Sequence, residues 1–515
     1  MSLSRRNFLK GATAIAVTAS WLARAAEPTE QQRIEAALPS RAAVKPRRPR
    51  KLLIFDRNVG YGGHPSAKIA NTAFTRMGQK TGAFETTVSS NPEVFHRESL
   101  QKFDAVFFNN TVGNLFTDPV LRQNLIEFVY SGGGLLGVHG TSVAFTRWPE
   151  GAKEDWPEFA LMLGTRGAAH MPGDGSEEVI VKLDDPTHPL NRVFDGKSFP
   201  YRSEFFRFHD PYSRNRVRVL LSMDNAATEK LQGAPLKPFR KDNDYAIAWV
   251  RNYGRGRVFY CSLGHNPYIF WDPKMLAFYL DAIQFALGDL DTPTLPSAKL
   301  TPAVRAQEQL GWRLGFETHT STLFDAIEKT AQLGLSFLGG SSLQQVSAEI
   351  PRNFDLQLTE DEWKQIRLKL DAHSVRLLTY HVPQIPDAPT ERRKLLAFAR
   401  KIGVETLVTE SARLDAMDKL CDQYDIRVAI RAEPETVLKA CAGRSQRLGG
   451  CFDLCARWER VKDRLMTVHA RTISQEALHE LHRLGIQPTM FALESTPDVA
   501  KNIESFNKIS LDLAK

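Results

Sequence analysis

The sequence predicts an α/β protein of two units, a doubly wound sandwich over residues 50–290 and a compact (β/α)8 TIM barrel over residues 305–515. In the first unit, short apolar runs alternate with helical patterns, which is typical of a mostly parallel sheet covered on both faces. In the second unit, a strand-like run followed by a helical pattern recurs eight times, as in a (β/α)8 barrel. Three prolines interrupt a polar stretch between the units, and we place a linker at 291–304.

The first unit is predicted to begin as a parallel sheet and to end in a partly antiparallel segment. Its strands are expected at 51–56, 104–109, 134–138, 218–222, 245–251 and 257–262, and its helices at 67–81, 119–131 and 273–287. The early strands are continuous apolar runs, which is the pattern of strands buried on both faces of a sheet.

The second unit is predicted to close into a barrel because its strand and helix patterns alternate without interruption. Strands are expected at 313–317, 335–338, 375–380, 405–409, 427–430, 449–454, 466–470 and 489–493, with amphipathic helices such as 322–333, 360–372, 389–402 and 414–424 between them. The loops that follow these strands are short, so the sequence indicates no long lid over the barrel.

The first 26 residues have the anatomy of an export signal, with a basic start, a weakly apolar stretch and small residues at the end. The motif SRRNFLK at 4–10 resembles the twin-arginine signal. This resemblance implies the twin-arginine export machinery as a partner and a periplasmic location. The alternative, a chance pair of arginines before a membrane anchor, is disfavoured because the apolar stretch is short and carries Thr13, Thr18 and Ser20. Residues 27–49 are polar and basic and are predicted to form a linker.

Charge and composition exclude several classes of protein. Half of the net charge of +8 comes from the four basic residues of the leader, and another basic cluster lies in the linker at 45–51. We therefore expect no nucleic-acid partner, since such proteins concentrate Lys and Arg on a folded face. No apolar run reaches the length of a membrane span, so stable membrane insertion is not expected. The five cysteines form no disulfide framework, and buried thiols are favoured over a Cys451–Cys455 pair.

A glycine-rich turn after the strand at 134–138 is predicted to expose His139, as a nucleophile elbow exposes its residue. His139 is neither a thiol nor a hydroxyl, so an acyl-enzyme route to amide hydrolysis has no nucleophile at this turn. The stretch resembles the trehalose-utilisation (ThuA-like) domain, a relative of class I glutamine amidotransferases. The resemblance rests on GHPS at 63–66, GGGLLGVHG at 132–140, THP at 187–189, SEFF at 203–206, AWVRNYGRGRVFY at 248–260 and SLGH at 262–265.

His139 and His265 follow predicted strands, and together with Glu204, which is also taken to lie near a strand end, they are candidates to converge on a ligand. Two imidazoles and a carboxylate suit either a bound sugar or a divalent metal. The structural alternative is that they are hydrogen-bonded residues without a ligand. Trp148, Trp156 and Trp271 are candidates for stacking on a sugar ring, with core packing as the favoured alternative.

In the barrel, acidic and imidazole side chains follow four strands near their carboxyl ends, where (β/α)8 barrels form their active sites. These residues are Glu410, Asp453, His469 and Glu494. Three carboxylates and one imidazole suit a divalent ion, with Mn²⁺ expected first and Mg²⁺ or Zn²⁺ as alternatives.

The barrel sequence resembles the xylose-isomerase-like sugar phosphate isomerases and epimerases, for example in GWRLG at 311–315 and FARKIGVETLV at 398–408. The resemblance implies that those four residues hold the metal. It also implies that Glu410 and Glu494 exchange a proton on a carbon next to a carbonyl, in isomerisation, epimerisation or elimination from a 3-keto-glycoside.

Two departures from that family alter the expected pocket. Residues 431–433 are RAE and residues 455–458 are CARW, where the family often carries histidines. Arg431 and Arg457 are thus candidates to bind a carboxylate or phosphate of the substrate, or to neutralise a carboxylate cluster that has lost its metal. His319 and His381, just past two other strands, are candidates for substrate contact or for structural roles.

The sequence therefore predicts an exported enzyme of carbohydrate metabolism that acts on a small sugar or glycoside with a divalent metal. The alternative is a non-catalytic carbohydrate-binding protein with a degenerate barrel site. A third hypothesis reverses the roles, with the chemistry at His139, Glu204 and His265 and the barrel as a scaffold. The oligomeric state is left open.

Overall fold

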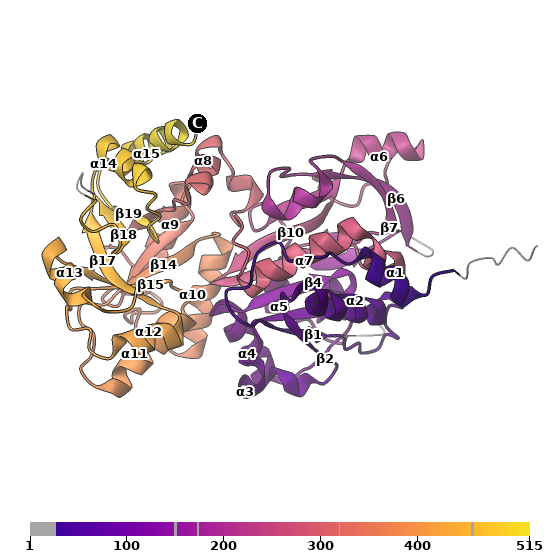
Figure 1. Ribbon diagram of the computed structural model, residues 1–515, viewed down its shortest axis with the longest axis horizontal. Helices are drawn as coiled ribbons and strands as arrows, with labels where there is room; N and C mark the ends of the chain where they lie inside the picture. The colour runs from indigo at the N-terminus through magenta and orange to yellow at the C-terminus, as the bar shows by residue number, and fades with distance from the viewer. Residues whose placement is uncertain (1–26, 149–151, 172–174, 319, 455–457) are drawn as a thin grey trace, which may run out of the picture.

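The computed structural model describes residues 27–148, 152–171, 175–318, 320–454 and 458–515. It contains two units side by side, a sheet sandwich and a closed barrel (Figure 1). This confirms the predicted fold class, a large mixed α/β sheet followed by an eight-stranded parallel barrel. Among the described helices, none combines the length and the apolar character needed to cross a bilayer.

The first unit is built on a nine-stranded sheet. Its order across the sheet is β2 (Glu85–Ser89), β1 (Lys51–Phe55), β3 (Ala105–Asn109), β4 (Gly134–Val138), β11 (Gly256–Cys261), β10 (Ala246–Tyr253), β9 (Arg218–Met223), β6 (Ser176–Leu183) and β7 (Phe199–Glu204). The strands from β2 to β11 are parallel, and the remaining neighbours pair antiparallel. A small antiparallel pair, β5 (Arg166–Ala169) and β8 (Arg207–His209), lies apart from the main sheet.

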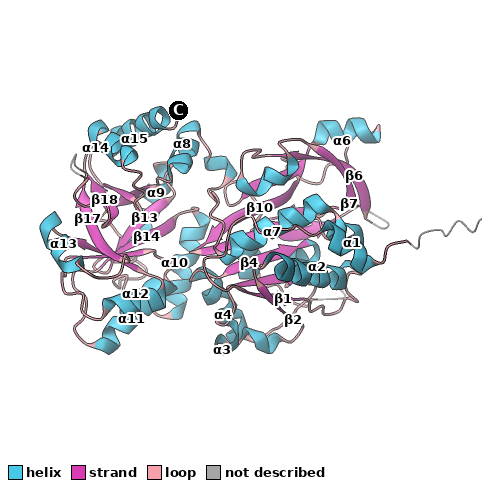
Figure 2. Ribbon diagram, in the orientation of Figure 1, coloured by secondary structure: helices cyan, strands magenta, loops and turns pink. Residues whose placement is uncertain are grey.

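Helices cover both faces of this sheet (Figure 2). One hydrophobic cluster joins the sheet to α1 (Glu30–Ala37), α2 (Ser66–Thr81) and α7 (Pro273–Leu287), and a second joins it to α4 (Pro119–Tyr130) and α5 (Pro157–Leu163). The remaining helices of this unit are α3 (Arg97–Leu100) and α6 (Asn225–Gln232). Residues 27–49, predicted as a linker, include α1, whose Ile34 is buried in the first cluster.

The second unit is the barrel. Its strands follow one another in chain order as β12 (Leu314–Glu317), β13 (Phe337–Ser341), β14 (Arg376–His381), β15 (Thr406–Thr409), β16 (Arg427–Arg431), β17 (Leu448–Asp453), β18 (Leu465–Ala470) and β19 (Phe491–Glu494). Its helices are α8 (Pro302–Leu310), α9 (Leu323–Gln332), α10 (Glu360–Ala372), α11 (Pro389–Lys401), α12 (Met417–Tyr424), α13 (Pro434–Cys441), α14 (Gln475–Arg483) and α15 (Val499–Leu513). Four described cysteines are buried free thiols, Cys261, Cys421, Cys441 and Cys451, whereas Cys455 lies outside the described residues.

The amino-terminal ends of the barrel strands face the sandwich. Arg376, the first residue of β14, donates from Nε to the carbonyl oxygen of Gly254 at 3.0 Å, in the turn between β10 and β11. In the same turn, Arg255 donates to the carbonyl oxygen of Asp425, just before β16. From the linker, Leu295 packs against a small cluster inside the barrel that includes Phe337 of β13. The carboxyl ends of the barrel strands therefore point away from the sandwich.

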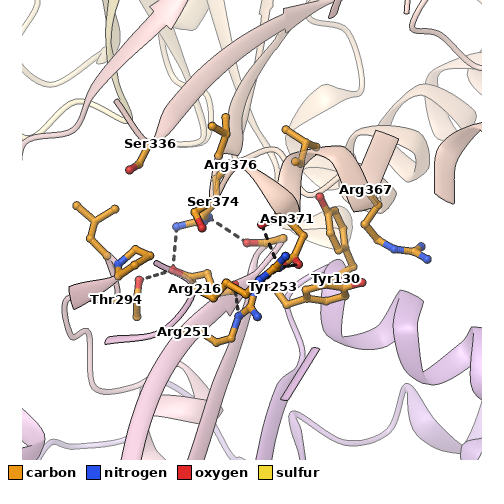
Figure 3. A pocket seen from close by; sticks show the side chains of 16 residues that line it. Tyr130, Arg216, Arg251, Tyr253, Thr294, Ser336, Arg367, Asp371, Ser374 and Arg376 are labelled. Carbon is orange, nitrogen blue, oxygen red and sulfur yellow. Dashed lines mark hydrogen bonds and ion pairs between the residues drawn. The ribbon is translucent and has the colours of Figure 1, made fainter. Parts of the chain in front are cut away.

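Buried ion pairs hold this interface together. Arg251 of β10 and Arg216 both pair with Asp371 at the end of α10, and Figure 3 shows the three side chains meeting beside a cavity of about 50 Å³. The side chains of Arg251 and Asp371 are each 5% exposed. Arg367 of α10 pairs in the same way with Glu158 of α5. Because a buried charge without its partner is costly, these pairs fix the relative position of the two units.

We expect Asp371→Ala to destabilise the protein by about 3–5 kcal/mol, because it leaves two guanidinium groups at the interface without their carboxylate. The measurement is urea unfolding together with the rate of proteolytic cleavage in the linker at 291–304. The matched control is Asp387→Ala, since the Asp387–Arg413 pair is 3.9 Å apart and about four-fifths exposed on both sides. Loss of this exposed pair should change the free energy of unfolding by less than about 1 kcal/mol. Equal effects of the two variants would contradict the role assigned to Asp371.

His188 makes the stability depend on pH. Its Nδ1 accepts from the backbone N–H of Leu190, so its Nε2 carries the hydrogen that it donates to the carbonyl oxygen of Pro293 in the linker. Burial, reinforced by the charges of Arg218 and Arg305, lowers the pKa of His188 to about 4. Between pH 6.5 and 4 the unfolded chain therefore binds a proton that the folded chain does not.

The contribution of neutral His188 to the free energy of unfolding is fully present above pH 6.5. It is lost as the pH falls toward 4, by at most about 1.4 kcal/mol per pH unit. We expect His188→Asn, which keeps an acceptor for Leu190, to flatten the pH dependence of the unfolding free energy in that window. His479→Gln, on the surface of α14, is the control and should leave the slope as it is. An unchanged slope in His188→Asn would refute this account.

Candidate metal centre

Four side chains converge at one edge of the sandwich sheet. His64 lies between β1 and α2, His139 directly follows β4, Glu204 ends β7, and His265 follows β11. One ligand atom from each lies within 4.8 Å of the others. His64, His139 and Glu204 are buried, and the side chain of His265 is one-quarter exposed. The structure thus brings His139, Glu204 and His265 together, and it adds His64 to them.

His139 occupies a strained turn that aims its ring into the cluster. Its φ of +45° is in the left-handed region, which residues other than glycine adopt at a cost. The sequence predicted the turn, but it predicted an exposed side chain, whereas His139 is fully buried. The reason is that β7 and the segment after β11 cover the turn and supply Glu204 and His265 around the ring.

The hydrogen bonds of His139 fix its tautomer. Its Nδ1 lies 2.9 Å from the carbonyl oxygen of Ser262 and must donate to it, which leaves the lone pair of the neutral ring on Nε2. That Nε2 lies 3.1 Å from a carboxylate oxygen of Glu204 and 3.3 Å from Nδ1 of His265. A lone pair facing a carboxylate at this distance requires a cation or a proton between them. Metal-ligating histidines typically have this second hydrogen bond to a backbone carbonyl.

His64 supplies an unsatisfied nitrogen. Its Nδ1 is buried and has no hydrogen-bond partner among the described residues. Burial, together with the proximity of the imidazoles of His139 and His265, lowers the pKa of His64 to about 3. The ring is therefore neutral at physiological pH, which is the form that binds a metal.

Glu204 is held as a carboxylate. Burial alone would raise its pKa, but the adjacent imidazole of His139, together with those of His265 and His170, outweighs burial and lowers it. Gly175 lies directly against this carboxylate, and a Cβ at Gly175 would stand 2.1 Å from Glu204 Oε2. The three imidazoles and one carboxylate form a donor set that fits a divalent transition metal.

Aromatic and imidazole side chains surround the cluster. The ring of Tyr61 lies 5.1 Å from that of His64 and 6.4 Å from that of Trp148. His170 Nδ1 is 3.5 Å from Glu204 Oε2, and its side chain is 42% exposed. The other two candidate tryptophans lie elsewhere, Trp156 in the core beside Phe145 and Trp271 under Arg33. Sequence reasoning gave His64 and His170 no role, although the GHPS motif that contains His64 was a usable signal.

The barrel mouth is organised differently from the sequence prediction. Arg431, at the end of β16, reaches Glu317, at the end of β12, with 3.2 Å between Nη2 and Oε1. In a closed eight-stranded order these two strands lie opposite each other, so the ion pair spans the mouth. Glu317 was not recognised from the sequence as part of the site.

This ion pair separates the residues that were predicted to hold the barrel metal. Glu410 lies on one side and contacts His381 Nε2 at 2.7 Å. On the other side, His469 lies 3.1 Å from Asp453 and 3.9 Å from Glu494. Among the described residues, only one group of three or more His, Cys, Asp or Glu side chains has ligand atoms that converge. That group is the cluster in the sandwich, His64, His139, Glu204 and His265. The predicted barrel set therefore does not fit a shared metal ion, while Arg457 and His319 lie outside the described residues.

Part of the sequence matches a known protein family. Residues 51–286 match the family model ThuA, described as trehalose utilisation. The sandwich is therefore similar to ThuA domains, and the carboxyl-terminal part of the chain forms a closed parallel barrel. No curated protein matches the chain.

Solved structures resemble each unit separately. A ThuA-like protein from Bacteroides uniformis is 23% identical, with 48% of this chain and 94% of that chain covered and a TM-score of 0.38. A xylose isomerase domain protein from Planctomyces limnophilus is 13% identical, with 39% and 97% covered and a TM-score of 0.30. A D-psicose 3-epimerase is 10% identical, with 39% and 96% covered and a TM-score of 0.29.

We expect Gly175→Ala to release bound metal without changing any ligand, because the new methyl group would displace Glu204. Elemental mass spectrometry of the purified variant measures this. Gly196→Ala is the matched control, since Gly196 has φ +69°, close to the +72° of Gly175, but no atom lies within 4 Å of its Cβ position. Both variants should lose about 1 kcal/mol of stability from backbone strain, and only Gly175→Ala should lose metal. Metal retained at wild-type stoichiometry in Gly175→Ala would contradict the placement of Glu204 in the site.

Proposed function

We propose that this protein is a periplasmic, metal-dependent enzyme that acts on a sugar or glycoside, with its metal centre in the ThuA domain. The observation that carries the proposal is the convergence of His64, His139, Glu204 and His265 at the carboxyl edge of the sheet. In open α/β sheets this edge is the usual place for a ligand. Export by the twin-arginine machinery is part of the proposal, on the strength of the motif at 4–10.

The donor set narrows the choice of metal. Mg²⁺ prefers oxygen ligands and keeps several waters, so three imidazoles disfavour it. Of the three ions considered from the sequence, this leaves Zn²⁺ and Mn²⁺. Zn²⁺ is the better match to a site rich in imidazole. The Ser262 carbonyl and the unpartnered Nδ1 of His64 prepare two of the imidazoles for coordination.

The reaction that we propose is removal of a proton next to a carbonyl, leading to isomerisation, epimerisation or elimination from a keto-glycoside. A bound divalent ion would polarise the carbonyl group and stabilise the enediolate charge. At the rim, His170 Nδ1 donates to the carbonyl oxygen of Met171 at 2.8 Å and lies 3.5 Å from Glu204 Oε2, so the lone pair of the neutral ring is on Nε2, and the side chain is 42% exposed. We assign proton transfer to His170 and contact with the sugar ring to Tyr61 and Trp148.

The test combines metal content with proton exchange. We expect close to one Zn or Mn per chain by elemental mass spectrometry, lost in Glu204→Ala and kept in Asp453→Ala, its matched control in the barrel. The metal-loaded protein should exchange deuterium from solvent into ketoses or 3-keto-glycosides next to the carbonyl, and EDTA should abolish this exchange. We expect His170→Ala to reduce the exchange about 100-fold or more while keeping the metal.

Two results would count against the proposal. If no metal is bound even after incubation with Zn²⁺ and Mn²⁺, the metal centre is wrong. If metal and sugar bind but no exchange occurs, the protein is a carbohydrate-binding protein, the alternative that the sequence left open.

A further inference from the structure

A hydroxyl, an imidazole and a carboxylate line up at the ends of three adjacent barrel strands. Ser341 ends β13, His381 ends β14, and Glu410 follows β15. Ser341 Oγ lies 3.3 Å from His381 Nδ1, and His381 Nε2 lies 2.7 Å from Glu410 Oε1. A nucleophile joined to a base that is oriented by a carboxylate is the arrangement of a serine hydrolase triad, which is recognised by geometry and not by fold.

The hydrogen bonds define the direction of proton transfer. A carboxylate can only accept, so His381 donates its Nε2 hydrogen to Glu410, and its Nδ1 carries the lone pair. Ser341 Oγ accepts from the backbone N–H of Leu343 at 3.2 Å, which leaves the hydroxyl hydrogen to point at His381 Nδ1. His381 is thus placed to take the proton of Ser341 when that oxygen attacks a substrate.

A pocket of about 260 Å³ adjoins this triad, lined by Ser341, Leu343, Gln344, His381 and Arg431. Arg431 is fixed through Nη2 by Glu317, while its buried Nε has no hydrogen-bond partner among the described residues. Gln344 is 3% exposed, and its Oε1 also has no partner in the described part of the chain. The pocket thus offers one unused donor and one unused acceptor next to a buried hydroxyl, which are features of a polar ligand site.

We propose that the barrel mouth is a second, metal-independent active site that hydrolyses a short-chain ester of a hydroxylated compound. Ser341 Oγ attacks the acyl carbon as its proton passes to His381 Nδ1, and the Arg431 Nε–H stabilises the oxyanion. His381 then protonates the leaving alkoxide, so the alcohol departs and an acyl-serine remains. Water attacks this acyl group with His381 as the base, and the acid is released with Ser341 restored.

The lining residues define the class of substrate. The pocket volume suits a short acyl group such as acetyl, and Leu343 at the rim, 66% exposed, provides an apolar contact for it. Gln344 Oε1 is an acceptor for a hydroxyl of the alcohol part. Glu410 does not touch the substrate and is a positioning residue that holds the His381 tautomer.

The test uses the full chain with p-nitrophenyl acetate and a fluorophosphonate probe. We expect hydrolysis above the buffer rate, labelling of Ser341 identified by peptide mass spectrometry, and a loss on the order of 100-fold or more in Ser341→Ala and His381→Gln. Ser342→Ala, at the neighbouring serine outside the pocket lining, is the matched control and should keep full activity. Labelling is measured on the wild-type chain, so this result tests the proposal even if the Ser341→Ala variant folds poorly.

The positioning role of Glu410 is tested by the rate and the pH profile of ester hydrolysis. Glu410→Gln should lower kcat and shift the pH profile of hydrolysis, because the amide no longer favours the required tautomer, and Glu410→Asp should restore part of the activity. EDTA should leave ester hydrolysis unchanged, whereas it abolishes the proton exchange proposed for the ThuA domain, so failure of one proposal is distinguishable from failure of the other. Absence of hydrolysis and labelling, labelling at another residue, or inhibition by EDTA would overturn the assignment.

Discussion

The carboxylate of Asp371 sets the arrangement of the whole molecule. It lies at the end of α10, in the barrel, and pairs with Arg216 and Arg251 of the sandwich, two of these three side chains being almost completely buried. A charge taken out of water requires a partner in a defined geometry, so such a contact tolerates little sliding between the units. The same relative position of the two units allows two further contacts. Arg376 donates a hydrogen bond to Gly254, and Leu295 packs at the amino-terminal end of the barrel.

The two candidate sites are built at equivalent positions but with opposite electrostatic requirements. In both, polar side chains follow the carboxyl ends of parallel strands, where the backbone turns away and leaves space. At the sandwich edge, lone pairs of His139 and Glu204 face each other and require a cation or a proton between them. At the barrel mouth, Arg431 supplies a fixed positive charge opposite Glu317, and hydrogens already connect Ser341, His381 and Glu410.

Much of the fold was predictable because apolar periodicity reports burial locally. The eight barrel strands and the sandwich strands β1, β3 and β4 depend only on which residues within a short window are apolar. The convergence of His139 and His265 was also within reach, since each follows a predicted strand, whereas β7, which ends at Glu204, was not among the predicted strands. Helix α1 was missed because its residues are mostly polar, and only Ile34, Ala37 and Leu38 reach the core.

Long-range pairing was the part that sequence could not supply. Arg431 was recognised as a departure from the expected pattern, but its partner Glu317 lies on the opposite strand of the closed barrel, 114 positions away in the chain. The pairing of Glu410 with His381 in place of a metal depends on the same closure. His64 joins the cluster through a loop before α2, and no periodicity indicates which loops of a sheet edge meet.

The orientation of the barrel has a consequence for how the two halves serve one another. Because the amino-terminal ends of its strands contact the turn between β10 and β11, the barrel mouth and the His139 edge open at opposite ends of the molecule, separated by roughly two strand lengths, on the order of 30 Å or more. A compound released at one candidate site would have to cross this distance before it reached the other. The covalent fusion therefore keeps the two candidate sites in equal numbers and at a fixed separation. A compound that both candidate sites bind would pass between them by diffusion through the solvent.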